Sequence, residues 1–432
     1  MHKITLPRLI SGFNLLLFIS TFSILSIRAQ TGLVAASSES VGVSSERLDK
    51  IGNMLSSSIE NDQIPGAVAL IAKDGKIVYH KAFGEADAEG KDLKKDHIFR
   101  IASQTKAITS TAVMMLWEEG RFKLDDPISK YIPAFEDEQV LVSFKEQDSS
   151  FQMIPANKEI TIRHLLSHTS GIGYGVIDGD DRFRKIYAKA GIVDLFTTND
   201  VTIEENIKKL AKLPLHHEPG EKFTYSEGLD VLGYFVEVIS GKPFDEFLKD
   251  RIFDPLNMQD TYFYLPESKA DRLVKIQKRE GDEWVNYPVT FYDPEYPATG
   301  AKKFFSGGAG LSSTALDYAK FLQMYLNGGN YNGNQILSPT TINMIMSNQT
   351  GDLFSGPENY YGLAFGVVSK EGEVKGGLGP EGTFDWGGYF NTQYFADPKN
   401  DIIGILMKQT QGPLNDETGW KFRQMVFSSI ID

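Results

Sequence analysis

The chain of 432 residues contains no cysteine. This absence excludes disulfide bonds, thiol nucleophiles, cysteine-ligated metal sites and a lipid anchor on a cysteine. The sequence also lacks the G-x-S-x-G pentapeptide of α/β-hydrolases and the H-E-x-x-H pair of zinc peptidases. We therefore expect neither an α/β-hydrolase nor a zinc peptidase.

Basic residues are too few and too dispersed for a nucleic-acid-binding surface. The chain has 44 Lys and Arg against 57 Asp and Glu, a formal net charge of −13. Binding to nucleic acid depends on clustered Lys and Arg that neutralise phosphates, and no basic stripe is present. Nucleic acid is therefore not expected as a partner.

Long apolar runs are confined to the N-terminus. Lys3 and Arg8 precede an almost entirely apolar stretch over 15–27, and Ala29-Gln30 is a plausible cleavage point. This order of features predicts a signal peptide over 1–29, followed by a linker over 30–44. We expect an exported protein, periplasmic or secreted, without stable membrane insertion after cleavage. A retained anchor is the alternative, although the run is short for a membrane span.

Strand-like runs occur near both ends of the chain, and helical patterns fill the middle. Residues 67–72 and 76–83 flank Asp74-Gly75, a strong hairpin signal. Further strands are expected over 363–368, 389–396 and 402–407, and helices over 45–60, 103–119, 229–239, 312–327 and 418–431. This order predicts an α+β fold. Its antiparallel sheet is formed by N- and C-terminal strands, flanked by helices, and carries a large, mostly helical insertion.

The densest group of potential metal ligands is His216-His217-Glu218, between Pro214 and Pro219. Adjacent histidines in an extended loop point in opposite directions, so they do not converge on one ion. We therefore expect no metal and no cofactor.

Ser103 and Lys106 form the one S-x-x-K sequence of the chain. In the first turn of a helix, residues i and i+3 lie on the same face and within contact. A serine nucleophile needs a group that takes its proton. A lysine can do so only when neutral, which requires its usual pKa of about 10.4 to fall to near 7. A helix N-terminus also supplies a backbone N–H for an oxyanion. On these residues alone, a capped helix with a surface lysine is the simpler interpretation.

The sequence around Ser103 carries further motifs in a definite order. FRIASQTK over 99–106 is followed by LDDPISKYIP over 124–133, IRHLLSHTSG over 162–171, PGEKFTYS over 219–226, DPLNMQDT over 254–261, GGAGLSS over 307–313 and DWGGY over 385–389. Together these segments closely resemble the serine β-lactamase and penicillin-binding protein family. The resemblance covers the chain from about Ser45 to its C-terminus.

The resemblance implies a role for each matching residue. Ser103 would be acylated, Lys106 would be its base or the partner of its base, and Tyr225 would act as base and later as proton donor. The backbone N–H groups of Ser103 and Tyr389 would form the oxyanion hole. Tyr325-Leu-Asn327 and Tyr389-Phe-Asn391 match a Tyr-x-Asn pattern better than Tyr225 does, but neither has the Pro-Gly lead-in.

The resemblance also implies a domain layout. A β-lactamase-like domain is expected over 45–432. It would comprise an α/β part over 45–130 and 300–432 and a mostly helical part over 131–299.

Two motifs depart from the family pattern. The usual Tyr-Ser-Asn is Tyr225-Ser226-Glu227, and Trp386-Gly387-Gly388 stands where Lys-Thr-Gly or His-x-Gly is usual. The rival Lys375-Gly-Gly377 lies in a glycine-rich loop. The lost cation would hold a substrate carboxylate, through a charged hydrogen bond worth about 1.5–3 kcal/mol. We expect Trp386 to offer an apolar wall and Glu227 to repel a carboxylate, with Gly387, Gly388 and Tyr389 completing the substrate-binding edge.

Ser-x-x-Lys, Tyr-Ser and Trp-Gly-Gly together look like the β-lactamase-like carboxylesterases of family VIII. The resulting hypothesis is an exported serine hydrolase that acts on small-molecule acyl substrates, most of all neutral carboxylic esters. The alternatives are a β-lactamase or D,D-peptidase, an acyltransferase, and a non-catalytic binding relative. The sequence does not indicate an oligomeric state.

Overall fold

The computed structural model describes residues 1–2, 32–412 and 415–431. All but the first two residues of the expected signal peptide lie outside the described residues, as does the start of the expected linker. No helix within the described residues is long and apolar enough to cross a membrane.

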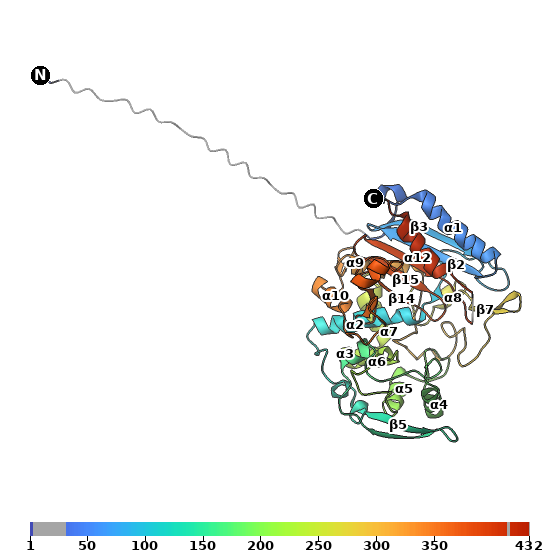
Figure 1. Cartoon of the computed structure of the whole chain (residues 1–432), viewed down its shortest axis with the longest axis vertical. Coiled ribbons are helices and arrows are strands. Elements are labelled where there is room, and N and C mark those ends of the chain that lie inside the picture. The colour runs from blue at the N-terminus through green and yellow to red at the C-terminus, as the bar shows by residue number, and fades with distance from the viewer. Residues whose placement is uncertain (3–31, 413–414, 432) are drawn as a thin grey trace.

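An eight-stranded sheet joins the two ends of the chain (Figure 1). Each neighbouring pair is antiparallel except β1 and β3, which are parallel. The β2–β16 pair, running from Val68 opposite Met407 to Lys73 opposite Ile402, connects the N-terminal strands to the C-terminal ones. The predicted sheet is therefore confirmed. Its strands in spatial order are β1 (Val34–Ala35), β3 (Lys76–Gly84), β2 (Gly66–Lys73), β16 (Ile402–Met407), β15 (Gln393–Asp397), β14 (Phe384–Gly387), β13 (Gly366–Val368) and β12 (Asn359–Tyr361).

Helices cover both faces of this sheet. α1 (Ser45–Glu60) and α12 (Thr418–Ser429) pack together on one face, and α2 (Thr105–Glu118) and α9 (Ala315–Leu326) lie on the other (Figure 1). Every residue of β2 is buried. Successive side chains of a strand point to opposite faces, so Ala67, Ala69 and Ile71 join the core under α1, whereas Val68, Leu70 and Ala72 join the core around α2.

The region between the N- and C-terminal strands contains more helix than strand, and its part over 139–240 lies beyond α2 from the sheet (Figure 1). It also contains two hairpins that the sequence pattern did not predict, β5 (Gln139–Lys145) with β6 (Ser150–Pro155) and β7 (Gln277–Glu280) with β8 (Glu283–Asn286). Almost none of their residues is buried, so they lack the apolar alternation that marks a half-buried strand. The helices here are α3 (Ile162–Leu166), α4 (Asp181–Ala190), α5 (Ile203–Leu210), α6 (Gly228–Ser240), α7 (Phe244–Leu248), the π-helical η5 (Lys249–Phe253) and α8 (Glu267–Ala270).

Short elements complete the described chain. The strands are β4 (Phe99–Arg100), β9 (Ser312–Ser313), β10 (Asn330–Tyr331) and β11 (Asn334–Gln335), and the helices are α10 (Pro339–Met346) and α11 (Lys370–Lys375). The 3-10 turns are η1 (Ser38–Val41), η2 (Ala102–Gln104), η3 (Ile128–Lys130) and η4 (Pro133–Phe135).

Local predictions succeed at the first hairpin and fail beside Trp386. Asp74 and Gly75 have φ of 51° and 69°, as a tight hairpin turn requires. The strand predicted over 389–396 is wrong at its start, because Trp386 lies within β14 and β15 begins only at Gln393. The Gly388 N–H donates to the Thr392 carbonyl, and Asn391 adopts a φ of 65°. The chain therefore reverses between these two strands.

Candidate active site

Ser103 lies in the turn that leads from β4 into α2. It belongs to the 3-10 turn η2, and α2 itself begins two residues later at Thr105. Ala102 has a φ of 43°, a conformation that residues with a Cβ rarely adopt. Ala102 and Gln104 are buried, whereas Ser103 is partly exposed. The turn thus presents one accessible hydroxyl at the start of a buried helix.

Lys106 is fully buried beside Ser103. Its Nζ lies 3.3 Å from Ser103 Oγ, 2.9 Å from the Tyr174 hydroxyl and 2.8 Å from the Gly308 carbonyl oxygen. The amine nitrogen, the one polar atom of the Lys106 side chain, therefore has three hydrogen-bond partners. The predicted contact between Ser103 and Lys106, across one helical turn, is present.

Tyr225 faces Lys106 with its ring. Lys106 Nζ lies 4.6 Å from the centroid of that ring, and the Tyr225 hydroxyl accepts a hydrogen bond from Trp386 Nε1 at 3.2 Å. The sequence predicted the Tyr225 hydroxyl itself against Ser103 and Lys106. Among the described residues, the tyrosine whose hydroxyl is bonded to Lys106 is instead Tyr174.

Tyr174 was missed from the sequence. A single tyrosine in an irregular segment carries no motif, so nothing in the sequence pattern singled it out. Burial raises the pKa of Tyr174 well above its usual value, and the neighbouring Tyr225 and Asp230 raise it further. Tyr174 is therefore a neutral phenol at neutral pH. Its backbone N–H donates to Asp178 Oδ2 at 2.8 Å, which helps to orient the residue.

Glu227 does not face the substrate side as a charged group. It is 1% exposed, and burial, together with a hydrogen bond to the Asp194 carboxyl, raises its pKa well above the usual value. The expectation that Glu227 adds a negative charge and repels a substrate carboxylate is therefore corrected. A buried carboxyl is cheaper to keep neutral than charged.

The Gly308 carbonyl reaches Lys106 because residue 308 has no side chain. A Cβ at this position would lie 2.3 Å from Asp230 Oδ2. Asp230 is buried and accepts hydrogen bonds from Ser306 Oγ at 2.5 Å and from the Gly308 N–H at 3.2 Å. This buried carboxyl thus helps to fix the loop whose Gly308 carbonyl contacts Lys106.

Gly388 allows the turn after β14 to approach the backbone that precedes Ser103. A Cβ at Gly388 would lie 2.5 Å from the Ile101 carbonyl oxygen and 2.1 Å from Thr392 Oγ1. The Gly388 N–H is already used by Thr392, at 2.8 Å. Within the described part of the chain, the backbone N–H groups of Ser103 and Tyr389 donate to no other protein group. Both can therefore serve an oxyanion.

Aromatic side chains wall this site. Trp386 lies 5.7 Å from Tyr225, 5.3 Å from Tyr361 and 6.4 Å from Phe354, measured between ring centroids. A second aromatic cluster packs around Ala102 and Tyr174; it contains Phe196, Tyr292, Tyr296 and Phe390, with Tyr287 and Tyr389 packed against it. The site is therefore largely apolar around the Ser103 hydroxyl.

Two alternative site assignments from the sequence find no support. Lys375 lies in α11 and forms an ion pair with Glu358 at 2.7 Å. His216 pairs with Asp178 at 3.1 Å, whereas His217 Nε2 lies 2.8 Å from Thr224 Oγ1. In the part of the chain that the structure describes, no group of three or more His, Asp or Glu side chains is placed to hold a metal ion.

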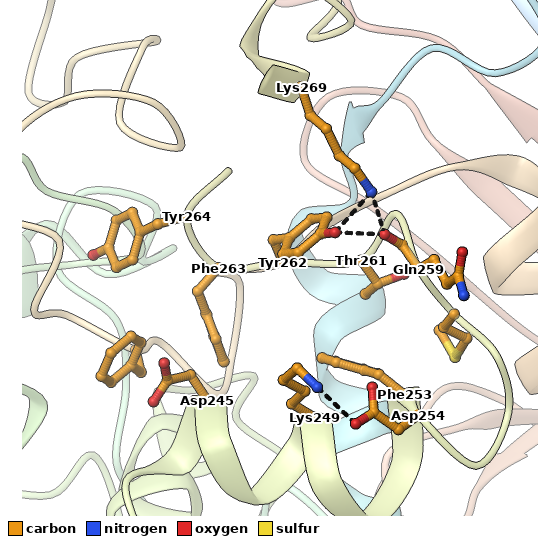
Figure 2. A pocket seen from close by; sticks show the side chains of 12 residues that line it. Asp245, Lys249, Phe253, Asp254, Gln259, Thr261, Tyr262, Phe263, Tyr264 and Lys269 are labelled. Carbon is orange, nitrogen blue, oxygen red and sulfur yellow. Dashed lines mark hydrogen bonds and ion pairs between the residues drawn. The ribbon is translucent and has the colours of Figure 1, made fainter. Parts of the chain in front are cut away.

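A separate cavity of about 400 Å³ opens beside α7 and η5 (Figure 2). Lys269 donates to the Tyr262 hydroxyl and to the Gln259 carbonyl, and Lys249 pairs with Asp254. None of the site residues named above lines it, so it is distinct from the site at Ser103. Its lining residues are Asp245, Lys249, Phe253, Asp254, Met258, Gln259, Thr261, Tyr262, Phe263, Tyr264, Lys269 and Phe305.

Comparisons with known proteins give matches over most of the chain. A family model described as Beta-lactamase matches residues 51–425. Esterase EstB of Burkholderia gladioli is 30% identical over 391 residues, covering 85% of this chain and 92% of that protein. A putative D-alanyl-D-alanine carboxypeptidase of Escherichia coli strain K12 is 28% identical over 409 residues, covering 89% and 87%. The structure of EstCE1, a hydrolase with promiscuous acyltransferase activity, matches with a TM-score of 0.74 at 26% identity, covering 88% and 99%.

Proposed function

The chain belongs to the β-lactamase family of serine hydrolases and is an enzyme, and from this premise we propose that it hydrolyses uncharged carboxylic esters through an acyl-enzyme on Ser103. The resemblance read from the sequence is confirmed at the level of the family and of its esterase relatives. The observation that carries the ester proposal is the hydrogen bond from Trp386 to Tyr225. It occupies the only polar group of the side chain that replaces the usual cation.

The first step is attack by Ser103 Oγ on the ester carbonyl carbon. Lys106 Nζ, 3.3 Å away, takes the hydroxyl proton. A neutral amine has two N–H groups and one lone pair. The Tyr174 hydroxyl and the Gly308 carbonyl accept hydrogen bonds from Lys106 Nζ, so a neutral Lys106 would keep its lone pair for the Ser103 proton. The backbone N–H groups of Ser103 and Tyr389 stabilise the oxyanion, each worth about 2.7–4 kcal/mol in comparable enzymes.

The second step is departure of the alcohol. The Tyr225 oxygen accepts the hydrogen bond from Trp386, so the phenolic O–H stays free to donate. Tyr225 is partly exposed, so a substrate can reach it. It donates its proton to the leaving alkoxide and is reprotonated from Lys106. Water then hydrolyses the acyl-enzyme by the reverse proton transfers.

The proposed substrate class follows from the absence of a cationic side chain among the aromatic residues described above. A carboxylate on the substrate needs a cationic partner, because an unpaired charge in an apolar site is costly. Trp386 supplies no such partner, and its indole packs against Tyr361 and Phe354. The relative EstB is named an esterase, which supports the same assignment.

The test compares the wild-type enzyme with Ser103→Ala on p-nitrophenyl acetate and butyrate. We expect hydrolysis by the wild type, covalent labelling by a fluorophosphonate probe, and loss of both in the variant. Absence of labelling in the wild type would contradict the enzyme mechanism. A strong preference for penicillin over both esters would favour the β-lactamase or D,D-peptidase alternative.

Acyl transfer to an alcohol is the second candidate function. It draws support from EstCE1, a hydrolase with promiscuous acyltransferase activity at 26% identity. The apolar walls also favour an organic acceptor over water at the acyl-enzyme. The test measures the ratio of ester to free acid formed from vinyl butyrate with added alcohol; a ratio of zero excludes this activity.

We also propose that the protein is exported. The basis is the pattern of charge and apolar residues over 1–29. Intact-mass measurement of the protein released from the periplasm or medium of an expressing cell tests this, with cleavage after Ala29 as the expected result. Full-length protein retained in the cell would contradict it.

A further inference from the structure

Three buried carboxyl groups lie around Lys106 and Tyr174. Asp194, Glu227 and Asp230 are 6%, 1% and 2% exposed. A buried carboxylate is costly unless hydrogen bonds or opposite charges compensate it. Asp230 is compensated by Ser306 and Gly308, but Asp194 and Glu227 have a different set of partners.

Asp194 holds the chain that follows Tyr174. Its carboxylate accepts hydrogen bonds from the backbone N–H groups of Gly175, at 3.0 Å, and of Val176. A Cβ at residue 175 would lie 2.3 Å from Asp194 Oδ2, so this approach requires glycine. The position of the Asp194 carboxylate therefore sets the position of the backbone on one side of Tyr174.

Glu227 holds the chain that precedes Tyr174. It stands at the N-terminal end of α6, and its backbone N–H donates to the Gly173 carbonyl at 3.1 Å. Its buried carboxyl lies within hydrogen-bonding reach of the Asp194 carboxyl, and its Oε1 has no hydrogen-bond partner among the described residues. Two carboxyl groups share a hydrogen bond only when one of them carries a proton. The two anchors of the Tyr174 segment are thus joined through a proton.

We propose that the Asp194–Glu227 carboxyl pair is a proton-dependent clamp that keeps the Tyr174 hydroxyl on Lys106. Glu227 and Asp194 are then positioning residues, since neither touches the reacting atoms. The inference rests on the proposed function, because it gives the contact between Tyr174 and Lys106 a part in that reaction. The clamp adds a cause of pH dependence that lies in buried residues outside the reacting atoms.

The charges around Glu227 determine the direction of this dependence. Asp194 and Asp230 oppose ionisation of Glu227, and Lys106 favours it when the lysine is protonated. Tyr187 and Tyr174 also face this pair, and both stay neutral because burial and the carboxyl groups raise their pKa values. As pH rises through the raised pKa of Glu227, the shared proton is lost and two buried negative charges repel each other. The clamp then opens, and the reaction slows on the alkaline side.

The experiment compares pH profiles of kcat for p-nitrophenyl butyrate in the wild type, Glu227→Gln, Glu227→Ala and Glu237→Gln. An amide at position 227 donates to Asp194 without a proton to lose, so Glu227→Gln should keep its activity to higher pH than the wild type. Glu227→Ala should lower kcat roughly 10- to 100-fold, as expected when a reacting group is misplaced by about 1 Å. Glu237 lies near the other end of α6 and accepts from the Phe244 N–H at 2.9 Å. Its variant should follow the wild-type profile.

A double-variant comparison tests whether Glu227 acts through Tyr174. Coupled residues give effects that do not add, so Glu227→Ala should not lower kcat further in a Tyr174→Phe background. An additive effect overturns the clamp, and so does a Glu227→Gln profile identical to that of the wild type. If Glu227→Ala does not fold, the Glu227→Gln profile decides alone. A wild type that neither hydrolyses esters nor labels at Ser103 instead overturns the proposed function, which keeps the two failures distinct.

Discussion

The Nε1–H of Trp386 donates a hydrogen bond to the hydroxyl oxygen of Tyr225 across 3.2 Å. One residue thereby has two effects. Trp386 stands where the family usually has the cation that would hold a substrate carboxylate. Its indole N–H also orients the tyrosine that the proposed reaction uses as proton donor. The proposed selectivity for uncharged esters and the proposed proton delivery to the leaving group therefore depend on the same residue.

Trp386→Phe should lower kcat for p-nitrophenyl butyrate by roughly 2- to 10-fold, the loss expected for one hydrogen bond of about 0.5–1.5 kcal/mol. KM should change little, because the phenyl ring keeps the apolar wall. Steady-state kinetics measure both constants. Trp420→Phe is the control, since Trp420 is 53% exposed on α12. A fall in kcat of the same size in the control would contradict the assignment.

Tyr225→Phe should lower kcat roughly 10²–10⁴-fold, because it removes the proposed acid and base. Tyr325→Phe is the comparison, since Tyr325 was a rival match to the Tyr-x-Asn pattern. Tyr325 is buried, and its hydroxyl lies 2.7 Å from Thr111 Oγ1, away from Ser103. We expect it to lower the free energy of unfolding by about 1 kcal/mol while leaving kcat unchanged. Steady-state kinetics and urea unfolding of both variants measure the two effects. A large loss of kcat in Tyr325→Phe but not in Tyr225→Phe would assign the catalytic role to Tyr325 instead.

Gly388→Ala should lower kcat roughly 10²–10³-fold, the size of effect seen when an oxyanion donor is lost. The new Cβ would meet the Ile101 carbonyl oxygen at 2.5 Å, so the turn must move away from Ser103. Gly387→Ala is a matched control, because its Cβ would meet only Thr392 O, at 3.4 Å. Equal kcat values in the two variants would show that the turn after β14 has no part in the reaction.

Glu138 should make stability fall with pH in a defined range. Burial raises the pKa of Glu138 from 4.5 to about 7. Its contribution to stability is therefore fully present below about pH 4.5 and is lost as pH rises towards about 7. Glu138→Gln lacks this loss, so the Tm of the variant relative to the wild type should rise across this range and level off above it. Thermal melts from pH 4 to 9 measure the difference. A constant Tm difference across the whole series would contradict the raised pKa.

Some features of the site were predictable because short stretches of chain decide them. The helix over 45–60 begins and ends as its sequence pattern predicted. The spacing of Ser103 and Lys106 placed their side chains in contact, and Asp74-Gly75 formed the expected turn. The ordered motifs from Phe99 to Tyr389 were sufficient to predict the family, and the strand-like runs near both ends of the chain predicted the sheet. In each case the signal lies in the chain itself, in helical periodicity, turn chemistry or the order of motifs.

Other features depended on contacts between distant parts of the chain. The Tyr174 hydroxyl reaches Lys106 across 68 positions of sequence, and no local pattern marks a single tyrosine in a loop. Glu227 was expected to be charged and near the substrate, but burial beside Asp194 raises its pKa well above the usual value, and burial is a property of the folded chain alone. The sequence by itself determined which family of hydrolases this protein joins and which serine and lysine stand together. The tertiary structure decided which tyrosine hydroxyl bonds to Lys106 and that the pKa of the Glu227 carboxyl is raised, because both depend on the groups that folding packs around them.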